Sequence, residues 1–265
     1  MAREASRVFG EVAEDYDRVR PGYPAELVDR VFGYGVPPGA ALEVGAGTGK
    51  ATVAFSGRGR DVTAIEPDPA MARFVHGARL VATTFEEYRP DREFALLYSA
   101  DAWHWTDPAT RWANAEWALM PGGVLALIVN GERVDDPVLR QSMVDAYAEI
   151  SPEVEIRDDR ITEDDLWRLW PGTELASQER FGAFEAHVFS YRMVRSAADQ
   201  LAHLATRSQF RMLPAEVRSR LTAALAGVFT SDVPIAVDAV LYLARLLSSN
   251  ASNRSAGIGR PSSSP

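Results

Sequence analysis

The sequence has no cysteine, which excludes disulfides, thiolate metal sites and cysteine nucleophiles. Lysine is nearly absent too, since Lys50 is the single lysine among 28 basic residues. No stretch approaches the roughly 20 apolar residues that a transmembrane helix needs, and residues 1–24 mix charged and apolar groups without a signal-peptide core. These absences predict a cytoplasmic protein with no membrane partner.

Basic residues are fewer than acidic ones, so the 265 residues carry a net charge of −9. An acidic surface repels polyanions on average, so we expect no nucleic-acid partner. With 46% hydrophobic residues, the chain can bury a sizeable core. These features are typical of an ordinary globular protein, and we expect a monomer or a homodimer.

Strand and helix patterns alternate in the first half of the chain. Five short apolar runs are predicted to be strands: 41–44, 62–65, 80–82, 94–99 and 124–129. Asp68-Pro69 and Asp107-Pro108 each pair a capping residue with a proline, a common helix start, and the second of these helices is expected to run to about Met120. Strands separated by helices favour parallel pairing in a doubly wound α/β sheet.

The second half is less regular. Helices are expected over 137–150, 196–207 and 214–229, and a strand over 184–193. The apolar run Val233–Leu247 fits either a strand or a helix. Residues 248–265 are mainly Ser, Asn, Gly, Pro and Arg, a composition that predicts disorder.

A glycine-rich loop, Gly45-Ala46-Gly47-Thr48-Gly49-Lys50, follows the first strand. A phosphate-binding P-loop would need glycine at Val44 and a hydroxyl at Ala51, so the sequence departs from the P-loop motif at two positions. A dinucleotide fingerprint would need a small residue where Lys50 stands, although Glu66 fits its acidic position. A glycine turn without any ligand is a further alternative.

Without exception, Leu42-Glu43-Val44-Gly45-Ala46-Gly47-Thr48-Gly49 resembles the first motif of class I S-adenosylmethionine-dependent methyltransferases. Further segments continue the resemblance in order, and together they are similar to the bacterial small-molecule branch, which includes trans-aconitate and ubiquinone/menaquinone-type methyltransferases. They are Tyr16–Pro24, Thr63–Met71, Phe85-Glu86, Ser99–Trp105 and Pro121-Gly122-Gly123. The likeness is strong over residues 8–130 and loose beyond them.

The resemblance implies a Rossmann-like, mostly parallel seven-stranded sheet in a single domain over 1–247. Residues 1–38 would form an N-terminal lid, 39–130 the cofactor-binding core, and 131–247 a helical cap with the last strands. The cofactor would be S-adenosyl-L-methionine. Its methionine part would lie on Gly45, Ala46 and Gly47, with Glu43 orienting the loop or the ammonium group.

The resemblance also places the rest of the cofactor. Glu66 would bind the ribose hydroxyls, since a carboxylate accepts two hydrogen bonds at once. Pro67 and Met71 would flank the adenine, Phe85 would cover it with Glu86 alongside, and Ser99 would face the methyl group.

His104 is the candidate general base, because it follows the fourth strand and histidine titrates near neutral pH. A structural role between Trp103 and Trp105 is the alternative. In the lid, Tyr16 is the second catalytic candidate, and Tyr23 and Arg20 join the two tryptophans as candidate substrate contacts. Aromatic residues of the second half favour a ring-containing substrate: Trp167, Trp170, Phe181, Phe184 and Phe210.

The acidic run at Asp158, Asp159 and Glu163–Asp165 lacks histidine and an EF-hand spacing, so no metal site is predicted. The function predicted is methyl transfer to a small acceptor, at oxygen or carbon in preference to nitrogen. Two alternatives stay open. They are a nicotinamide-dependent oxidoreductase and an S-adenosylmethionine-binding protein without transferase activity.

Overall fold

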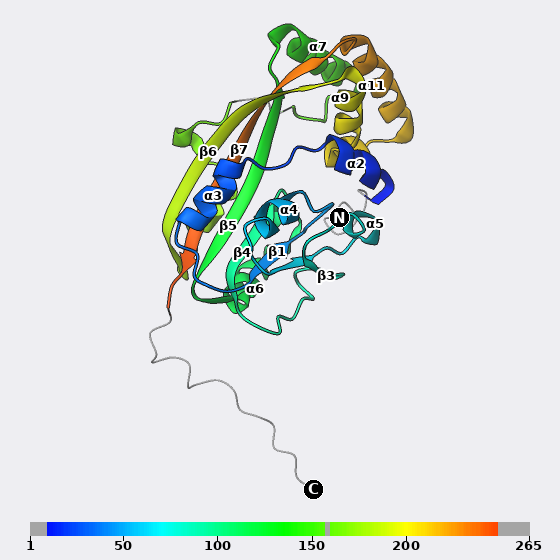
Figure 1. Cartoon of the computed structure of the whole chain (residues 1–265). Coiled ribbons are helices and arrows are strands. Elements are labelled where there is room, and N and C mark those ends of the chain that lie inside the picture. Colours follow the sequence, from blue (N-terminus) through cyan, green and yellow to red (C-terminus); the bar gives the residue numbers. More distant parts are fainter. Residues whose placement is uncertain (1–9, 157–159, 249–265) are drawn as a thin grey trace.

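The computed structural model of the chain describes residues 10–156 and 160–248. Within these ranges, seven strands form one sheet in the order β3-β2-β1-β4-β5-β7-β6 (Figure 1). The strands are β1 (Ala41–Val44), β2 (Val62–Ile65), β3 (Arg79–Val81), β4 (Phe94–Ala100), β5 (Leu119–Val134), β6 (Phe181–Arg195) and β7 (Val233–Leu246). The predicted tail from 249 onward and the acidic residues Asp158 and Asp159 lie outside the described ranges.

The sheet is mostly parallel, as expected. Strands β3, β2, β1, β4 and β5 run in one direction, whereas β7 is antiparallel to both β5 and β6. The chain moves from β1 toward one edge through β2 and β3, then returns to the centre with β4. The gap between β1 and β4 is therefore the switch point at which doubly wound folds bind ligands.

Helices and short 3-10 turns connect and cover the strands. They are η1 (Gly10–Val12), α2 (Ala13–Val19), α3 (Ala25–Gly33), α4 (Lys50–Ser56), α5 (Pro69–Ala72), η2 (Trp103–Trp105), α6 (Arg111–Ala118), α7 (Pro137–Ile150), η3 (Glu163–Asp165), α8 (Gly172–Leu175), α9 (Ala197–Ala205), α10 (Ser208–Arg211) and α11 (Ala215–Val228). Asp68 caps α5 as predicted, with its side chain accepting from the backbone N–H of Ala70. By contrast, α6 begins three residues after Pro108 and ends before Met120, because Leu119 already pairs with Phe94 in the sheet.

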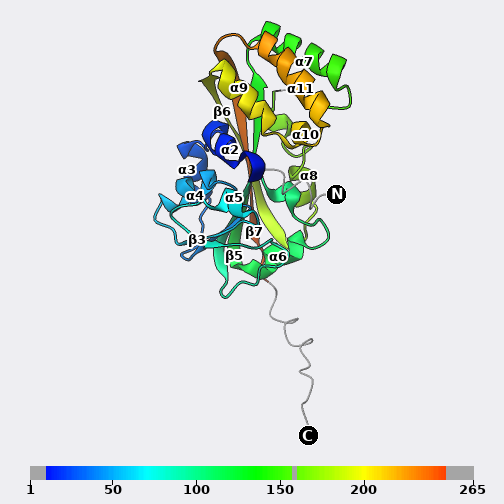
Figure 2. The same cartoon turned by 90° about the vertical axis from the view of Figure 1, so that its right-hand side faces the viewer.

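Helices cover both faces of the sheet (Figure 2). On one face, α3 and α4 bury Leu27, Val31 and Phe55 against β1, β4 and β5. On the other face, α6 and α8 bury Trp112 and Leu175 in a second apolar cluster. The result is a three-layer α/β/α arrangement.

A third apolar cluster forms the cap. The long strands β5, β6 and β7 continue past the short ones and carry α7, α9 and α11 at their far ends (Figure 1). The ambiguous run Val233–Leu247 is thus a strand, β7, up to Leu246. Its side chains are buried on both faces, and this hides the alternation that identifies a half-buried strand.

The expected N-terminal lid divides into two parts. Helix α2 contacts α9 of the cap, whereas α3 packs on the sheet with Leu27, Val28 and Val31 fully buried. Of the described residues of this segment, 10–38, only those up to Tyr23 reach the pocket described below. Helix α3 therefore belongs to the core.

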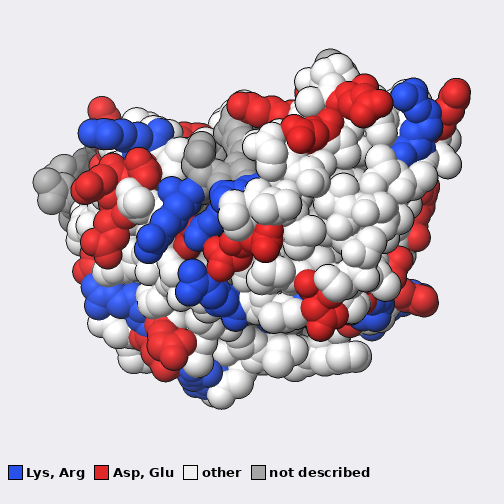
Figure 3. All heavy atoms as spheres, turned by 90° about the horizontal axis from the view of Figure 1, so that it is seen from above, with Lys and Arg blue, Asp and Glu red and all other residues white. Residues whose placement is uncertain are grey.

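The surface viewed from the cap end mixes acidic and basic side chains and leaves a broad uncharged area (Figure 3). No extended basic surface is seen on this face among the residues that the structure describes. None of the helices in residues 10–156 and 160–248 has both the length and the apolar character to cross a bilayer.

Candidate functional site

A cavity of about 800 Å³ opens where β1, β2 and β4 end, at the switch point of the sheet. Its walls come from segments that lie far apart in the sequence. The lining residues are 16, 20, 21, 23, 43–48, 50, 51, 65–67, 71, 83–87, 100–102, 104–108, 130, 132 and 207–209. The glycine loop, the end of β2, the N-terminal segment and the cap thus meet around one space.

The glycine loop needs its glycines. Gly45, Gly47 and Gly49 all have positive φ angles, of 72°, 57° and 85°, a region that side chains disfavour. Gly45 also lies against Ala102, so closely that a Cβ at position 45 would collide with the Ala102 side chain. The loop therefore passes very close to the segment that follows β4.

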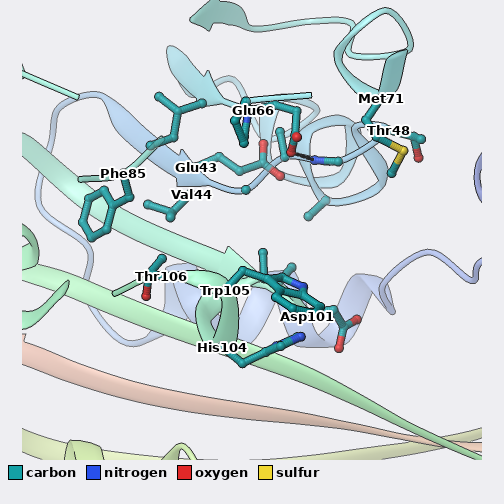
Figure 4. Close-up of a pocket in the computed structure, with 18 of the residues that line it drawn as sticks. Glu43, Val44, Thr48, Glu66, Met71, Phe85, Asp101, His104, Trp105 and Thr106 are labelled. Atoms are coloured by element: carbon teal, nitrogen blue, oxygen red, sulfur yellow. Dashed lines mark hydrogen bonds between the residues drawn. The ribbon is translucent and has the colours of Figure 1, made fainter. Parts of the chain in front are cut away.

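Glu66 points from the end of β2 onto the loop (Figure 4). One carboxylate oxygen accepts from the Gly47 backbone N–H at 2.8 Å and the other from Asp68 N–H at 2.9 Å. Burial raises the pKa of Glu66, and these two donors act against the rise. Each oxygen keeps a second lone pair for a ligand.

Glu43 is buried beneath the loop, with 1% of its surface exposed. Its carboxylate accepts from the Thr52 hydroxyl at 2.6 Å and from the Tyr98 hydroxyl at 3.0 Å. Burial raises the pKa of Glu43 to about 7, although these two bonds oppose the shift. Its position fits the orienting of the loop more directly than contact with a ligand.

The raised pKa of Glu43 predicts a pH dependence of folding. The unfolded chain releases this proton near pH 4.5 and the folded chain only near 7, so folding takes up a proton between these values. The free energy of unfolding should fall across this window, by about 3 kcal/mol from this group. Urea denaturation of wild type and Glu43→Gln should show the variant gaining relative stability as the pH rises. A constant difference between the two would contradict the prediction.

Several predicted cofactor contacts lie around the cavity. Met71 and Phe85 are buried, with 4% and 5% of their surfaces exposed, and both line it together with Ala46 and Pro67. Glu86 lines it too, but one of its oxygens already accepts from the backbone N–H of Asp107 at 2.6 Å.

Two predicted site residues lie away from the cavity. Ser99 is fully buried, and its hydroxyl donates to the Val44 carbonyl at 2.9 Å, which ties β4 to β1. Trp103 is a core residue, because its ring is buried against Phe85 and Trp112 and does not itself line the cavity. The structure thus places Ser99 off the lining, and the expected substrate contact at Trp103 is replaced by core packing.

His104 and Trp105 do line the cavity, with their rings 4.6 Å apart. Partial loss of solvent, and to a lesser degree the Arg111 guanidinium, lower the pKa of His104 to about 4. The imidazole is therefore neutral at pH 7. It can accept a hydrogen bond, but it is a weaker base than an ordinary histidine.

The N-terminal segment supplies Tyr16, Arg20 and Tyr23 to the lining. Arg20 donates from Nε and Nη2 to the hydroxyl and carbonyl of Thr206, both at 3.1 Å, and its guanidinium stacks on Tyr16 at 4.9 Å. The Tyr23 hydroxyl donates to Asp101 at 2.9 Å. These bonds hold the segment to the cap and to the end of β4.

Residues that the sequence did not single out complete the lining. They include Asp101, Asn130 and Glu132, and Arg207–Gln209 from the cap. The position of Asp101, just after an apolar strand at the expected ligand crevice, was a usable signal for it. The aromatic residues expected from the second half are absent from the lining. Phe181 and Phe210 are buried in the core, whereas Trp167, Trp170 and Phe184 are partly exposed outside the lining. Trp170 still lies near the cavity, with its ring centre 6.1 Å from that of His104.

Comparison with known proteins agrees with this geometry. Residues 42–127, from β1 into β5, match the family model described as a methyltransferase domain. The match identifies a methyltransferase domain in this part of the chain.

Relatives of the methyltransferase domain are found in mycobacteria. Uncharacterized methyltransferases of Mycobacterium tuberculosis and Mycobacterium bovis are 38% identical to this chain over 136 residues, which are 48% of this chain. The chain thus matches about half, 54%, of the length of these curated relatives.

A solved structure assigned as a type II methyltransferase of Anaeromyxobacter dehalogenans has a TM-score of 0.63 and 22% identity. The alignment covers 86% of this chain and 98% of that one. At this identity the likeness concerns the fold, and it extends to the cap as well as to the methyltransferase domain.

Proposed function

We propose that this protein transfers a methyl group from S-adenosylmethionine to a small-molecule acceptor, in the manner of the bacterial small-molecule branch that its sequence resembles. The observation that carries the proposal is the Glu66 carboxylate, which lies against the glycine loop inside a cavity of about 800 Å³. A cavity of this volume can hold the donor and a small acceptor together.

Charge favours this donor over a dinucleotide. Among the described residues, the lining carries seven carboxylates and only three basic side chains. The carboxylates are Glu43, Glu66, Glu86, Glu87, Asp101, Asp107 and Glu132, and the basic residues are Arg20, Lys50 and Arg207. The Gly47 backbone N–H, which a pyrophosphate would need, already donates to Glu66. The negative charge of Glu66 would therefore repel the pyrophosphate of a dinucleotide. A sulfonium with an ammonium group is attracted instead.

The residues present fit the parts of the donor. Glu66 would accept the ribose hydroxyls on its remaining lone pairs, and Phe85 and Met71 would enclose the adenine. The loop from Gly45 to Gly47 would hold the methionine part, with Arg20 toward its carboxylate. The bound donor supplies an activated methyl group, so the protein has mainly to align the acceptor and exclude water.

Calorimetric titration with S-adenosylmethionine, S-adenosylhomocysteine and NAD tests the proposal. We expect both sulfur ligands to bind and NAD not to bind. Glu66→Ala should weaken their binding by about 1–3 kcal/mol because two hydrogen bonds are lost, and Glu66→Gln should weaken it less. Binding of NAD alone would favour the oxidoreductase alternative. Binding without methyl transfer to any acceptor would favour a binding protein.

A further inference from the structure

Asp101 is a carboxylate in the pocket that the proposed function leaves without a role. It follows β4 directly and has a φ of 54°, the left-handed region that residues other than glycine seldom adopt. Such backbone is often kept at functional sites, where the surroundings hold it in place. The next residue, Ala102, is the one that contacts Gly45, so the glycine loop lies immediately beside Asp101.

Protein donors hold the Asp101 side chain in one orientation. Its Oδ1 accepts from the backbone N–H of Asn130 at 2.8 Å, and its Oδ2 accepts from the Tyr23 hydroxyl at 2.9 Å and from Asn130 Nδ2 at 3.1 Å. A carboxylate can accept about four hydrogen bonds. Asp101 thus keeps about one acceptor position for a ligand in the cavity that it lines.

Asp101 is a better proton acceptor than the other titratable groups at this end of the pocket. Burial raises the pKa of Tyr16 and of Tyr23, and the Asp101 charge adds to both shifts, so both hydroxyls stay protonated. His104 is a weak base, and Glu132 is already paired with Arg195. Burial raises the pKa of Asp101 itself, which makes its carboxylate a stronger base than an exposed one.

We propose that Asp101 binds the reacting hydroxyl or amine of the acceptor and takes up its proton, so that the acceptor class is a protic alcohol, phenol or amine and not a carboxylic acid. This inference rests on the proposed function. The acceptor's oxygen or nitrogen forms a bond to the methyl carbon while the methyl–sulfur bond breaks and leaves its electron pair on sulfur. The acceptor's proton passes to the free lone pair of Asp101. An acceptor carboxylate has no proton to give, and it would meet the charges of Asp101 and Glu132.

Three probes that share one ring distinguish these classes, namely benzyl alcohol, benzylamine and benzoate. Each is titrated by saturation-transfer NMR into protein already loaded with S-adenosylhomocysteine, whose binding is measured first. Failure of that first step would count against the proposed function, whereas a wrong order among the probes counts against the role of Asp101 alone. We expect benzylamine and benzyl alcohol to bind and benzoate to bind at least about tenfold more weakly.

Asp101→Asn keeps the shape of the side chain and removes its charge. It should weaken benzylamine binding by about tenfold or more, because a charged hydrogen bond is lost, and change S-adenosylhomocysteine binding by less than about twofold. Asp91→Asn makes the same change at an exposed carboxylate that pairs with Arg79 outside the lining, and it should leave probe binding unchanged. Tyr23→Phe, which keeps the Asp101 charge, should retain the preference for benzylamine over benzoate even if Asp101→Asn folds poorly. Equal binding of benzoate, unaltered benzylamine binding by a folded Asp101→Asn, or no binding of any probe to the loaded protein would overturn the proposal.

Discussion

Replacing Arg195 by methionine should lower the free energy of unfolding by about 3–5 kcal/mol, because it leaves a buried carboxylate without its partner. Arg195 ends β6, and its guanidinium donates to Glu132 of β5 and to Gln200 of α9. The side chains of Arg195 and Glu132 are only 3% and 9% exposed. Arg195 thus connects the sheet with α9 of the cap beside the pocket that Glu132 lines, so its loss should loosen both.

Urea denaturation followed by circular dichroism measures this loss. Arg192→Met is the matched control on the same strand, because Arg192 pairs with Asp135 while 80% of its side chain is exposed. That variant should cost less than about 1 kcal/mol. Adding Glu132→Leu to Arg195→Met should recover much of the lost stability, since no charge then stays buried unpaired. Equal losses for Arg192→Met and Arg195→Met would show that burial of the pair is not the cause.

The cofactor half of the fold could be predicted because its signals are local. The spacing of Gly45–Gly49 and Glu66 is enough to predict a cofactor-binding loop. The start of α5 is predicted from two adjacent residues, Asp68 and Pro69. Strands β1 to β4 fall within a residue or two of their predicted positions, since turn residues bound each apolar run.

The rest of the site depends on contacts that spacing does not reveal. Asp101 is positioned by Asn130 and by Tyr23, which lie 29 and 78 residues away in the chain. Trp103 and Trp105 are two residues apart, yet one ring enters the core and the other lines the cavity. Such choices are made by tertiary packing, so the sequence predicted the segment and not the role of each residue.

Gly45→Ala should lower the free energy of unfolding by about 2–5 kcal/mol and abolish measurable binding of S-adenosylhomocysteine. Two costs combine here. A φ of 72° disfavours any side chain by about 1–2 kcal/mol. The new methyl group would also overlap the Ala102 side chain, and overpacking of this kind costs about 1–3 kcal/mol. Relief of the overlap must move the loop away from Asp101, and this separates the donor side of the pocket from the acceptor side.

Gly59→Ala separates these two costs. Gly59 has a nearly equal φ of 75°, but nothing lies within 4 Å of the Cβ that it would gain. The Gly59→Ala variant should therefore lose only about 1–2 kcal/mol of its free energy of unfolding, and it should bind S-adenosylhomocysteine as wild type does. The difference between the two variants measures the contact between the loop and Ala102. If Gly45→Ala unfolds at the same urea concentration as Gly59→Ala and still binds the ligand, the close approach of loop and β4 is not required, and the glycine at position 45 serves only the backbone angle.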